Sequence, residues 1–297
     1  MKNQKEKPVS GIDEQLQKEI LDVITTIAQG IKNPTPYQFA TYNGQRKTIG
    51  DVFNGNYNKD QITLRLVVID SLYSTNARYS YFSIDEIAEE IWKLGNTEKC
   101  AQDYFYSLAT EFKDDNGLFS KHYGSRKNLE EGSMMKSLLS KYAYYSLLKD
   151  KANYPLGFPI YDRLAKSSFR TVCKKLGLKI SMPDDPRIVD YVSRMNDLRK
   201  VLFGNDALFD GLQQFDVLDA YLWRMGKFED GNLSLLIGKD DYNKFVTNLN
   251  LKLAALNGFD EKVVKECAKA NTNPFKGLSN EKYLNKLLEH WRSIRKA

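Results

Sequence analysis

The sequence is poor in the residues that most often build metal centres and disulfide frameworks. Its 297 residues include only two histidines and three cysteines, and Cys100, Cys173 and Cys267 lie far apart without a CxxC pair. This count and spacing argue against a disulfide framework, a zinc site and an iron–sulfur cluster. The two histidines also argue against a histidine-dependent triad. We therefore expect no metal and no cofactor.

Long apolar runs are also missing. The N-terminus, Met1–Lys7, leads into no apolar segment of the kind that a signal peptide contains. The longest apolar stretch, residues 64–72, is interrupted by Arg65 and Asp70, whereas a membrane span needs about 20 predominantly apolar residues. We expect a cytoplasmic protein that does not bind membranes.

Familiar catalytic signatures are absent as well. The sequence contains no GxGxxG, GxxxxGK[ST], HExxH or GxSxG motif, which argues against nucleotide hydrolysis, zinc proteolysis and serine-ester hydrolysis. The net charge, 44 − 38 = +6, is mild for this length. It fits either a polyanion-binding face or ordinary solubility.

The chain does contain enough apolar and aromatic residues for a core, at 42% and 12% of the sequence. Steps of three and four between apolar residues predict helices, whereas the alternation typical of strands is not sustained. We predict an all-α assembly of about ten helices. The expected helices cover residues 12–31, 62–75, 83–95, 98–112, 134–148, 160–176, 187–203 and 208–225, with three more centred on 245–256, 261–270 and 281–294. Residues 37–59 are polar and contain three glycines, which predicts an extended loop.

Two helix starts carry specific signals. Ser83 and Glu86 have the spacing of a capping box. Asp184-Asp185-Pro186 places an aspartate before a proline, which suits an N-cap followed by the first helical position. Residues 62–75 are apolar nearly all round, which predicts a buried helix.

The most interesting polar residues for chemistry are Lys141 and Asp162, which lie 162 − 141 = 21 positions apart. Lys141 stands among apolar and aromatic neighbours, so its helix should bury it and disfavour its charged form. A neutral amine is a nucleophile that can form a Schiff base. Asp162 follows a proline-restrained turn near a helix N-terminus, where the helix dipole stabilises a carboxylate. The plainer alternative is a solvated lysine and an ordinary N-cap.

Ser140-Lys141-Tyr142, followed by Pro159-Ile160-Tyr161-Asp162, resembles the helix–hairpin–helix DNA glycosylases, especially their 8-oxoguanine branch. Residues 69–78 are similar to the buried helix of that branch, which ends in an asparagine turn, and Asn76 matches the asparagine. The resemblance covers roughly residues 60–175. The chain departs from the family in the hairpin, because residues 131–137 have one glycine and no proline. Ser133, Lys136 and Ser137 are the candidate phosphate donors that replace hairpin amides.

The resemblance implies base excision on double-stranded DNA with a damaged base that is flipped out of the stack. It implies that Lys141 attacks the sugar C1′ and forms an imine, while Asp162 stabilises developing positive charge and helps accept a proton. Asn76 would fill the gap in the duplex, with Arg78 or Tyr79 at the opposite base. A late helix would line the base pocket, with Phe215, Asp219 and Trp223 as candidates, although Trp223 suits a core equally well.

The domain division that follows is residues 1–59 as an N-terminal helix and loop, 60–180 as a glycosylase-like core, and 181–297 as a helical part packed on it. The function expected is a DNA glycosylase with AP-lyase activity on an oxidised purine such as 8-oxoguanine, acting as a monomer and associated with the nucleoid. One alternative is an inactive DNA-binding or interaction protein on the same scaffold, favoured by the degenerate hairpin. A helical protein–protein scaffold, supported only by composition, is another.

Overall fold

The computed structural model describes residues 12–33, 37–73, 81–95, 97–111, 117–124, 133–206 and 208–229, with a few residues between 249 and 256. For residues 37–43, 81–83, 133 and 227–229 it describes only the backbone. Within these ranges 70% of the structure is helix, in nine helices, which confirms the predicted all-α class. The described strands are β1 (His122–Tyr123) and β2 (Ser133–Met134), which form one short antiparallel pair.

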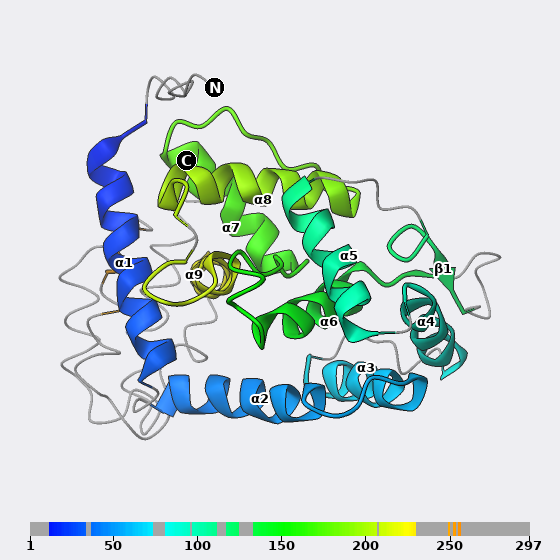
Figure 1. Ribbon diagram of the computed structural model, residues 1–297. Coiled ribbons are helices and arrows are strands. Elements are labelled where there is room, and N and C mark those ends of the chain that lie inside the picture. The colour runs from blue at the N-terminus through cyan, green and yellow to red at the C-terminus, as the bar shows by residue number, and fades with distance from the viewer. Residues whose placement is uncertain are drawn as a thin grey trace, which may run out of the picture.

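The helices surround a central group of three (Figure 1). The nine are α1 (Glu14–Lys32), α2 (Tyr37–Phe53), α3 (Lys59–Tyr73), α4 (Tyr81–Lys93), α5 (Glu98–Glu111), α6 (Lys136–Leu148), α7 (Arg163–Lys175), α8 (Ile188–Phe203) and α9 (Gln214–Glu229). In Figure 1, α2 and α3 follow one another along one edge, α8 runs along the opposite edge, and α6, α7 and α9 lie between them. One continuous apolar core contains residues from Ile20 to Leu256, so it crosses both boundaries of the expected domain division.

Helix α1 forms where the apolar spacing predicts it. Ile20, Val23, Ile24 and Ile27 are each at most 1% exposed and make one face of the helix. Asp13 caps its N-terminus, since the Asp13 side chain accepts a hydrogen bond from the Leu16 backbone N–H at 3.0 Å.

The predicted loop over residues 37–59 is wrong, because α2 occupies most of it. Ile49 and Phe53, four residues apart, are both 0% exposed, so one face of this polar helix still enters the core. Glycine inside a helix costs about 1 kcal/mol relative to alanine. Burial of two large apolar side chains, at about 1.5–3 kcal/mol each, offsets Gly44 and Gly50.

The expectation that α3 is buried all round is also wrong. Its inner face carries Ile62, Leu66 and Ile69 at 0% exposure, but Leu64 and Val67 are each 44% exposed. The helix lies at the edge of the molecule (Figure 1), so the side that faces α2, α4 and α6 is covered and the outer side is exposed.

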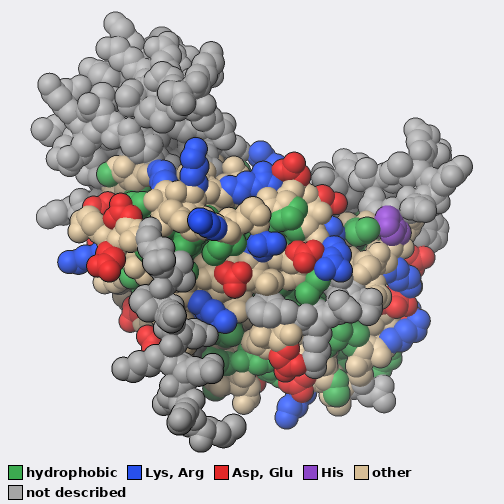
Figure 2. Space-filling view, turned by 90° about the horizontal axis from the view of Figure 1, so that it is seen from above, with side chains coloured by type: hydrophobic (Ala, Val, Ile, Leu, Met, Phe, Trp, Pro, Cys, Tyr) green, Lys and Arg blue, Asp and Glu red, His purple; other side chains and the backbone are tan. Residues whose placement is uncertain are grey.

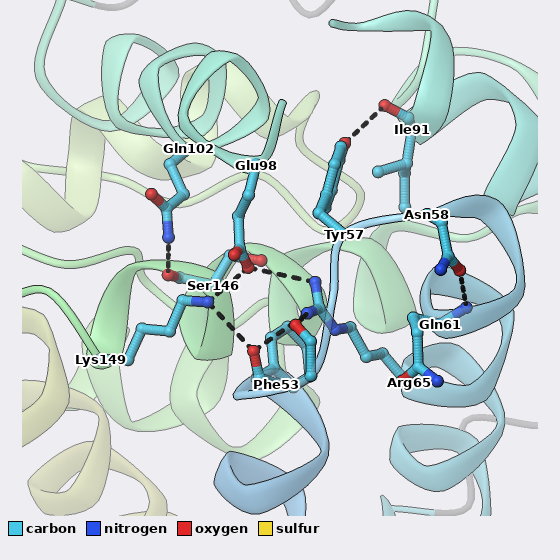
Figure 3. A network of polar contacts seen from close by, with 11 residues as sticks. Phe53, Tyr57, Asn58, Gln61, Arg65, Ile91, Glu98, Gln102, Ser146 and Lys149 are labelled. Carbon is cyan, nitrogen blue, oxygen red and sulfur yellow. Dashed lines mark hydrogen bonds and ion pairs between the residues drawn. The ribbon is translucent and has the colours of Figure 1, made fainter. Parts of the chain in front are cut away.

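Arg65 on α3 is fully buried and ties together three helix ends (Figure 3). Its guanidinium donates to the carbonyls of Phe53 and Gly55, each at 3.0 Å, and pairs with Glu98 at 3.1 Å. Lys149 also donates to the Phe53 carbonyl and pairs with Glu98. These contacts satisfy carbonyls at the C-terminal end of α2, where a helix leaves its last acceptors unpaired.

Several helix boundaries differ from the sequence prediction. Helix α4 begins at Tyr81, so Ser83 lies inside it and is not its N-cap. Helix α8 begins at Ile188 with Arg187 as its N-cap, so the Asp184-Asp185-Pro186 start is wrong. Asp185 instead accepts hydrogen bonds from Lys136 and Tyr161, which hold it away from the α8 terminus.

Helix α9 also begins later than predicted. Residues 209–212 form a tight reversal in which Phe209 and Leu212 exchange two backbone hydrogen bonds of 2.9 Å, with Gly211 at φ +75°. Helical residues at 249, 252–253 and 255–256 fall in the first predicted C-terminal helix, and the other two predicted helices lie outside the described residues. Among the helices that are described, none combines the length and apolar content needed to cross a bilayer.

Helices α7 and α9 cross closely at Gly226. A Cβ atom at Gly226 would lie 2.7 Å from the Leu164 Cβ and 2.9 Å from the Leu164 carbonyl oxygen. The glycine therefore lets α9 approach the first turn of α7, which follows directly on Asp162.

Candidate functional site

Lys141 lies in α6, a largely buried helix at the centre of the molecule (Figure 1). Nearly every residue of α6 from Leu138 to Leu147 is buried, and Lys141 itself is 4% exposed. Its Nζ donates to the Ser137 Oγ at 2.7 Å and reaches the Ser137 carbonyl at 3.4 Å. The Tyr73 ring at the end of α3 lies 5.3 Å from Nζ. The amine is thus enclosed by its own helix and by α3.

Burial lowers the pKa of Lys141 below its ordinary value, because the enclosed site disfavours the ammonium form. The carboxyl groups of Asp162 and Asp219 act in the opposite direction and raise the pKa of Lys141. Burial is the larger effect. The neutral amine that Schiff-base chemistry requires is therefore favoured here relative to a solvated lysine.

Asp162 is the N-cap of α7, which begins at Arg163 rather than at Ile160 as predicted. Its backbone is extended, with φ −132° and ψ 143°, and its Oδ1 accepts from the N–H groups of Leu164 at 2.8 Å and Ala165 at 3.3 Å. Asp162 is therefore an ordinary N-cap in the structure, which is the alternative role that the sequence also allows. Capping does not remove it from the site, since the same carboxylate acts electrostatically on Lys141.

Side chains from three helices hold the segment that leads to Asp162. The Ile160 N–H donates to the Asp219 Oδ2 of α9 at 2.8 Å, and the Ile160 carbonyl accepts from the Tyr191 hydroxyl of α8 at 2.6 Å. The Tyr161 N–H donates to the Ser140 Oγ of α6 at 2.9 Å. Because Ser140 directly precedes Lys141 and Tyr161 directly precedes Asp162, this hydrogen bond from a backbone N–H to a side-chain hydroxyl links the segments that carry the amine and the carboxylate.

Asp219 belongs to the same cluster. It is 6% exposed, and burial, with smaller contributions from the nearby Asp216 and Asp162, raises its pKa well above the ordinary value. The Ile160 N–H and Lys141 favour the charged form of Asp219 but do not outweigh burial. Its Oδ1 is buried without a hydrogen-bond partner in the structure. A protonated carboxyl, whose burial costs less than that of a carboxylate, suits this position.

The candidate site therefore contains Lys141 and the two carboxyl groups that act electrostatically on it, Asp162 and Asp219; a shared catalytic role of Lys141 and Asp162 stays a prediction. Sequence reasoning assigned no role to Ser140 and did not single out Tyr191. Ser140 carries a usable signal, because a hydroxyl at a buried helical position needs a partner. Tyr191 carries none, since aromatic residues are common in cores.

The other expected base-pocket residues lie differently. Phe215 is 0% exposed and is part of the continuous core. Trp223 is half-buried, with the Arg224 guanidinium 5.9 Å from its ring. Neither has a described contact with Lys141 or Asp162.

The expected DNA contacts are only partly described. Asn76, Arg78 and Tyr79 lie outside the described residues, as does the side chain of Ser133. Ser137 faces the Lys141 amine. Lys136, at the start of α6, donates to the Asp185 Oδ1 at 3.1 Å and to the Pro186 carbonyl at 2.9 Å.

Basic residues are interspersed with acidic ones on the face that Figure 2 shows, so no single-sign stripe crosses its described part. Before the site in sequence, Lys121 pairs with Glu90 at 3.1 Å, whereas Arg126 and Lys127 lie outside the described residues. Charge alone therefore does not outline a nucleic-acid surface on this face.

Other nucleophiles and metal ligands do not gather at the site. Burial raises the pKa of the Cys173 thiol to about 12, which keeps it protonated at neutral pH. Cys173 and Cys100 are both free thiols. In the part of the chain that the structure describes, no three His, Cys, Asp or Glu side chains are grouped to hold a metal ion.

No protein-family model matches the chain, and neither a curated protein nor a solved structure matches it. The resemblance to the helix–hairpin–helix glycosylases therefore stays a prediction that rests on short motifs.

Proposed function

We propose that the protein is a DNA glycosylase with AP-lyase activity, which removes an oxidised purine such as 8-oxoguanine through a Schiff base on Lys141. The observation that carries this proposal is the enclosed Lys141 amine, 4% exposed and with a lowered pKa, on which the Asp162 carboxylate at the N-terminus of α7 acts electrostatically. An amine of this kind is unusual for a lysine with only a structural role, because lysines are almost never fully buried unless paired.

The chemistry needs no cofactor. The flipped nucleotide presents its C1′ to the neutral amine. The Lys141 nitrogen bonds to C1′ as the C1′–N9 bond breaks; the electron pair of that bond leaves with the base, which takes up one of the two amine protons. The C1′–O4′ bond then opens, O4′ takes up the second amine proton, and the nitrogen lone pair completes the C1′=N imine. Removal of a C2′ proton then expels the 3′ phosphate by breaking the C3′–O3′ bond. Water hydrolyses the imine and releases Lys141.

Asp162 and Asp219 have separate roles in this scheme. The Asp162 carboxylate, held by two backbone N–H groups, stabilises the positive charge that develops on the sugar as the base departs. Asp219 is a positioning residue, because its carboxyl holds the Ile160 N–H two residues before Asp162. An ionised Asp219 favours the ammonium form of Lys141, and the raised pKa of Asp219 widens the pH range in which its carboxyl is neutral and this effect is absent.

A borohydride trapping assay tests the proposal. The protein is incubated with duplexes that contain 8-oxoguanine or an abasic site, and borohydride reduces any imine to a stable covalent adduct. The wild-type chain should form the adduct and Lys141→Gln should not. Lys174→Gln is the matched control, since Lys174 is an exposed lysine on α7, and it should react as the wild type does. Absence of adduct with every lesion would refute the enzyme.

The pH dependence of trapping gives a second readout. The fraction of neutral amine rises as pH passes through the pKa of Lys141, and this pKa is lowered from its ordinary value of 10.5. The rate of adduct formation should therefore rise with pH and level off at a lower pH than a solvated lysine requires.

An inactive DNA-binding protein on the same scaffold is the second candidate. The observation that favours it is the hairpin region, where α6 begins at Lys136 after Met135, with no side-chain cap and without the glycine-rich turn of the family. This candidate predicts salt-sensitive DNA binding without any borohydride adduct.

A further inference from the structure

We propose that Lys136, Tyr161 and Lys166 form a binding site for a phosphodiester group of a DNA strand, and that Asp185 occupies this site in the free protein. The inference rests on the DNA-binding part of the proposed function and is independent of its imine chemistry.

Two donors from different elements converge on one oxygen of Asp185. The Lys136 Nζ, at the first residue of α6, lies 3.1 Å from the Asp185 Oδ1, and the Tyr161 hydroxyl lies 3.0 Å from the same atom. The Lys136 side chain is only 10% exposed, whereas that of Asp185 is 82% exposed. The donors are therefore built into the protein, and the anion reaches them from an exposed loop.

Lys166 on α7 completes the donor set. Its Nζ lies 3.2 Å from the Tyr161 hydroxyl and 4.6 Å from the centre of the Tyr161 ring. Burial is the main cause of its lowered pKa, and the like charges of Arg170 and Lys136 lower it further. Asp185 acts in the opposite direction. Lys166 is thus connected to the Asp185 oxygen through the Tyr161 hydroxyl, while Lys136 contacts that oxygen directly.

This donor set suits a phosphate oxygen. Lysine ammonium groups and tyrosine hydroxyls are common donors to the DNA backbone, and such contacts fix the position of the strand without reading its sequence. The Asp185 carboxylate presents the same kind of charged acceptor at the same distance. It therefore competes with the strand for the site.

The position fits the proposed chemistry. Asp162 follows Tyr161 directly, and its carboxylate influences the pKa of both Lys141 and Lys166. A phosphodiester held by Lys166 and Tyr161 would therefore lie next to the nucleotide that Lys141 attacks. The helix α6 that carries Lys141 starts at Lys136, so both sites are positioned by the same two helices, α6 and α7.

A purely structural role for Asp185 makes a different prediction. Lys136 and Lys166 also donate to the carbonyls of Pro186 and Asp184, at 2.9 Å and 3.0 Å, and so hold this loop. If Asp185 only anchors the loop, its removal changes stability and not DNA binding. Asp184 is the matched control, because its side chain is 96% exposed and pairs with Arg170 rather than with Lys136.

The experiment compares Asp185→Asn with Asp184→Asn in the full chain. Fluorescence anisotropy measures binding to a labelled duplex with a tetrahydrofuran abasic analogue, which cannot form an imine, over a range of salt concentrations. Both variants lose one negative charge. Asp185→Asn should bind more tightly than Asp184→Asn, and its plot of log K against log[salt] should be steeper by up to about 0.9, the value of one additional phosphate contact. Equal affinity and equal slope would overturn the proposal.

Lys166→Gln tests the third donor and leaves Lys136 and Tyr161 in place. In the Asp185→Asn background it should cancel the gain in affinity, whereas Lys174→Gln on the same helix should not. Equal effects of these two lysine variants would also overturn the proposal, and thermal unfolding of each variant checks that it is folded. Borohydride trapping separates the two proposals. An adduct on Lys141 without a specific effect of Asp185→Asn would support the enzyme and refute the phosphate site. A specific effect of Asp185→Asn without any adduct would support the phosphate site and refute the enzyme.

Discussion

Replacing Asp219 by asparagine should change how stability depends on pH. The Asp219 carboxyl is buried, accepts from the Ile160 N–H at 2.8 Å, and has a pKa raised well above its ordinary value of 3.8. Asparagine has nearly the same shape, and its side-chain oxygen can accept the same hydrogen bond, but it has no titrating group. The substitution therefore isolates the free-energy cost of burying a carboxyl group that can ionise.

The sign follows from proton binding. Above about pH 4 the carboxyl is ionised in the unfolded chain but still protonated in the folded one, so folding takes up a proton. As pH rises from the pKa of Asp219 in the unfolded chain to its pKa in the folded chain, each pH unit lowers the free energy of unfolding of the wild type by about 1.4 kcal/mol. The advantage of Asp219→Asn should be smallest near pH 4 and should grow with pH until the folded pKa is reached.

Urea unfolding followed by circular dichroism, at several values between about pH 4 and pH 7, measures this difference. Asp51→Asn is the control, since the Asp51 side chain is 57% exposed and the substitution removes one surface carboxylate. A difference between Asp219→Asn and the wild type that stays constant over this range would refute the reasoning. The same variant also removes an influence that raises the pKa of Lys141, so the pH midpoint of borohydride trapping should move downward.

Two further substitutions test how the fold holds the site. Arg65→Met removes, at a position with 0% exposure, the guanidinium donors to the Phe53 and Gly55 carbonyls and one of the two cations that pair with Glu98. It should lower the free energy of unfolding in urea by about 3–5 kcal/mol; Lys149→Met should cost less, and an Arg65→Met cost below about 1 kcal/mol would contradict this. Gly226→Ala places a Cβ 2.7 Å from Leu164 and should cost about 1–3 kcal/mol while reducing trapping. Gly44→Ala, with nothing within 4 Å of the added atom, should instead raise the free energy of unfolding by up to about 1 kcal/mol. Equal effects of Gly226→Ala and Gly44→Ala would show that close packing at Gly226 is not the cause.

The sequence alone predicts local features well where one helix face decides them. The apolar steps in α1 and the crowded apolar surroundings of Lys141 correspond to a buried face and a buried lysine in the structure. Helix α2 shows the limit of such reasoning. Its polar composition and glycines predict a loop, but Ile49 and Phe53 reach a core that other helices supply.

The tertiary structure alone decided what surrounds Lys141 and Asp162. The Ile160 N–H is held by Asp219, which lies 219 − 160 = 59 positions further along the chain, and no spacing rule connects residues that far apart. The same holds for Asp185, whose position before a proline predicts an N-cap but whose carboxylate is held by Lys136 and Tyr161.

Residue type and neighbouring residues were enough to predict a buried amine and a carboxylate at a helix terminus, because burial within one helix and capping are local properties. The charge state of that amine depends on desolvation by the packed helices and on carboxyl groups from α7 and α9. Electrostatic energies depend on distance through space and on exclusion of water, and both arise only when the helices pack together.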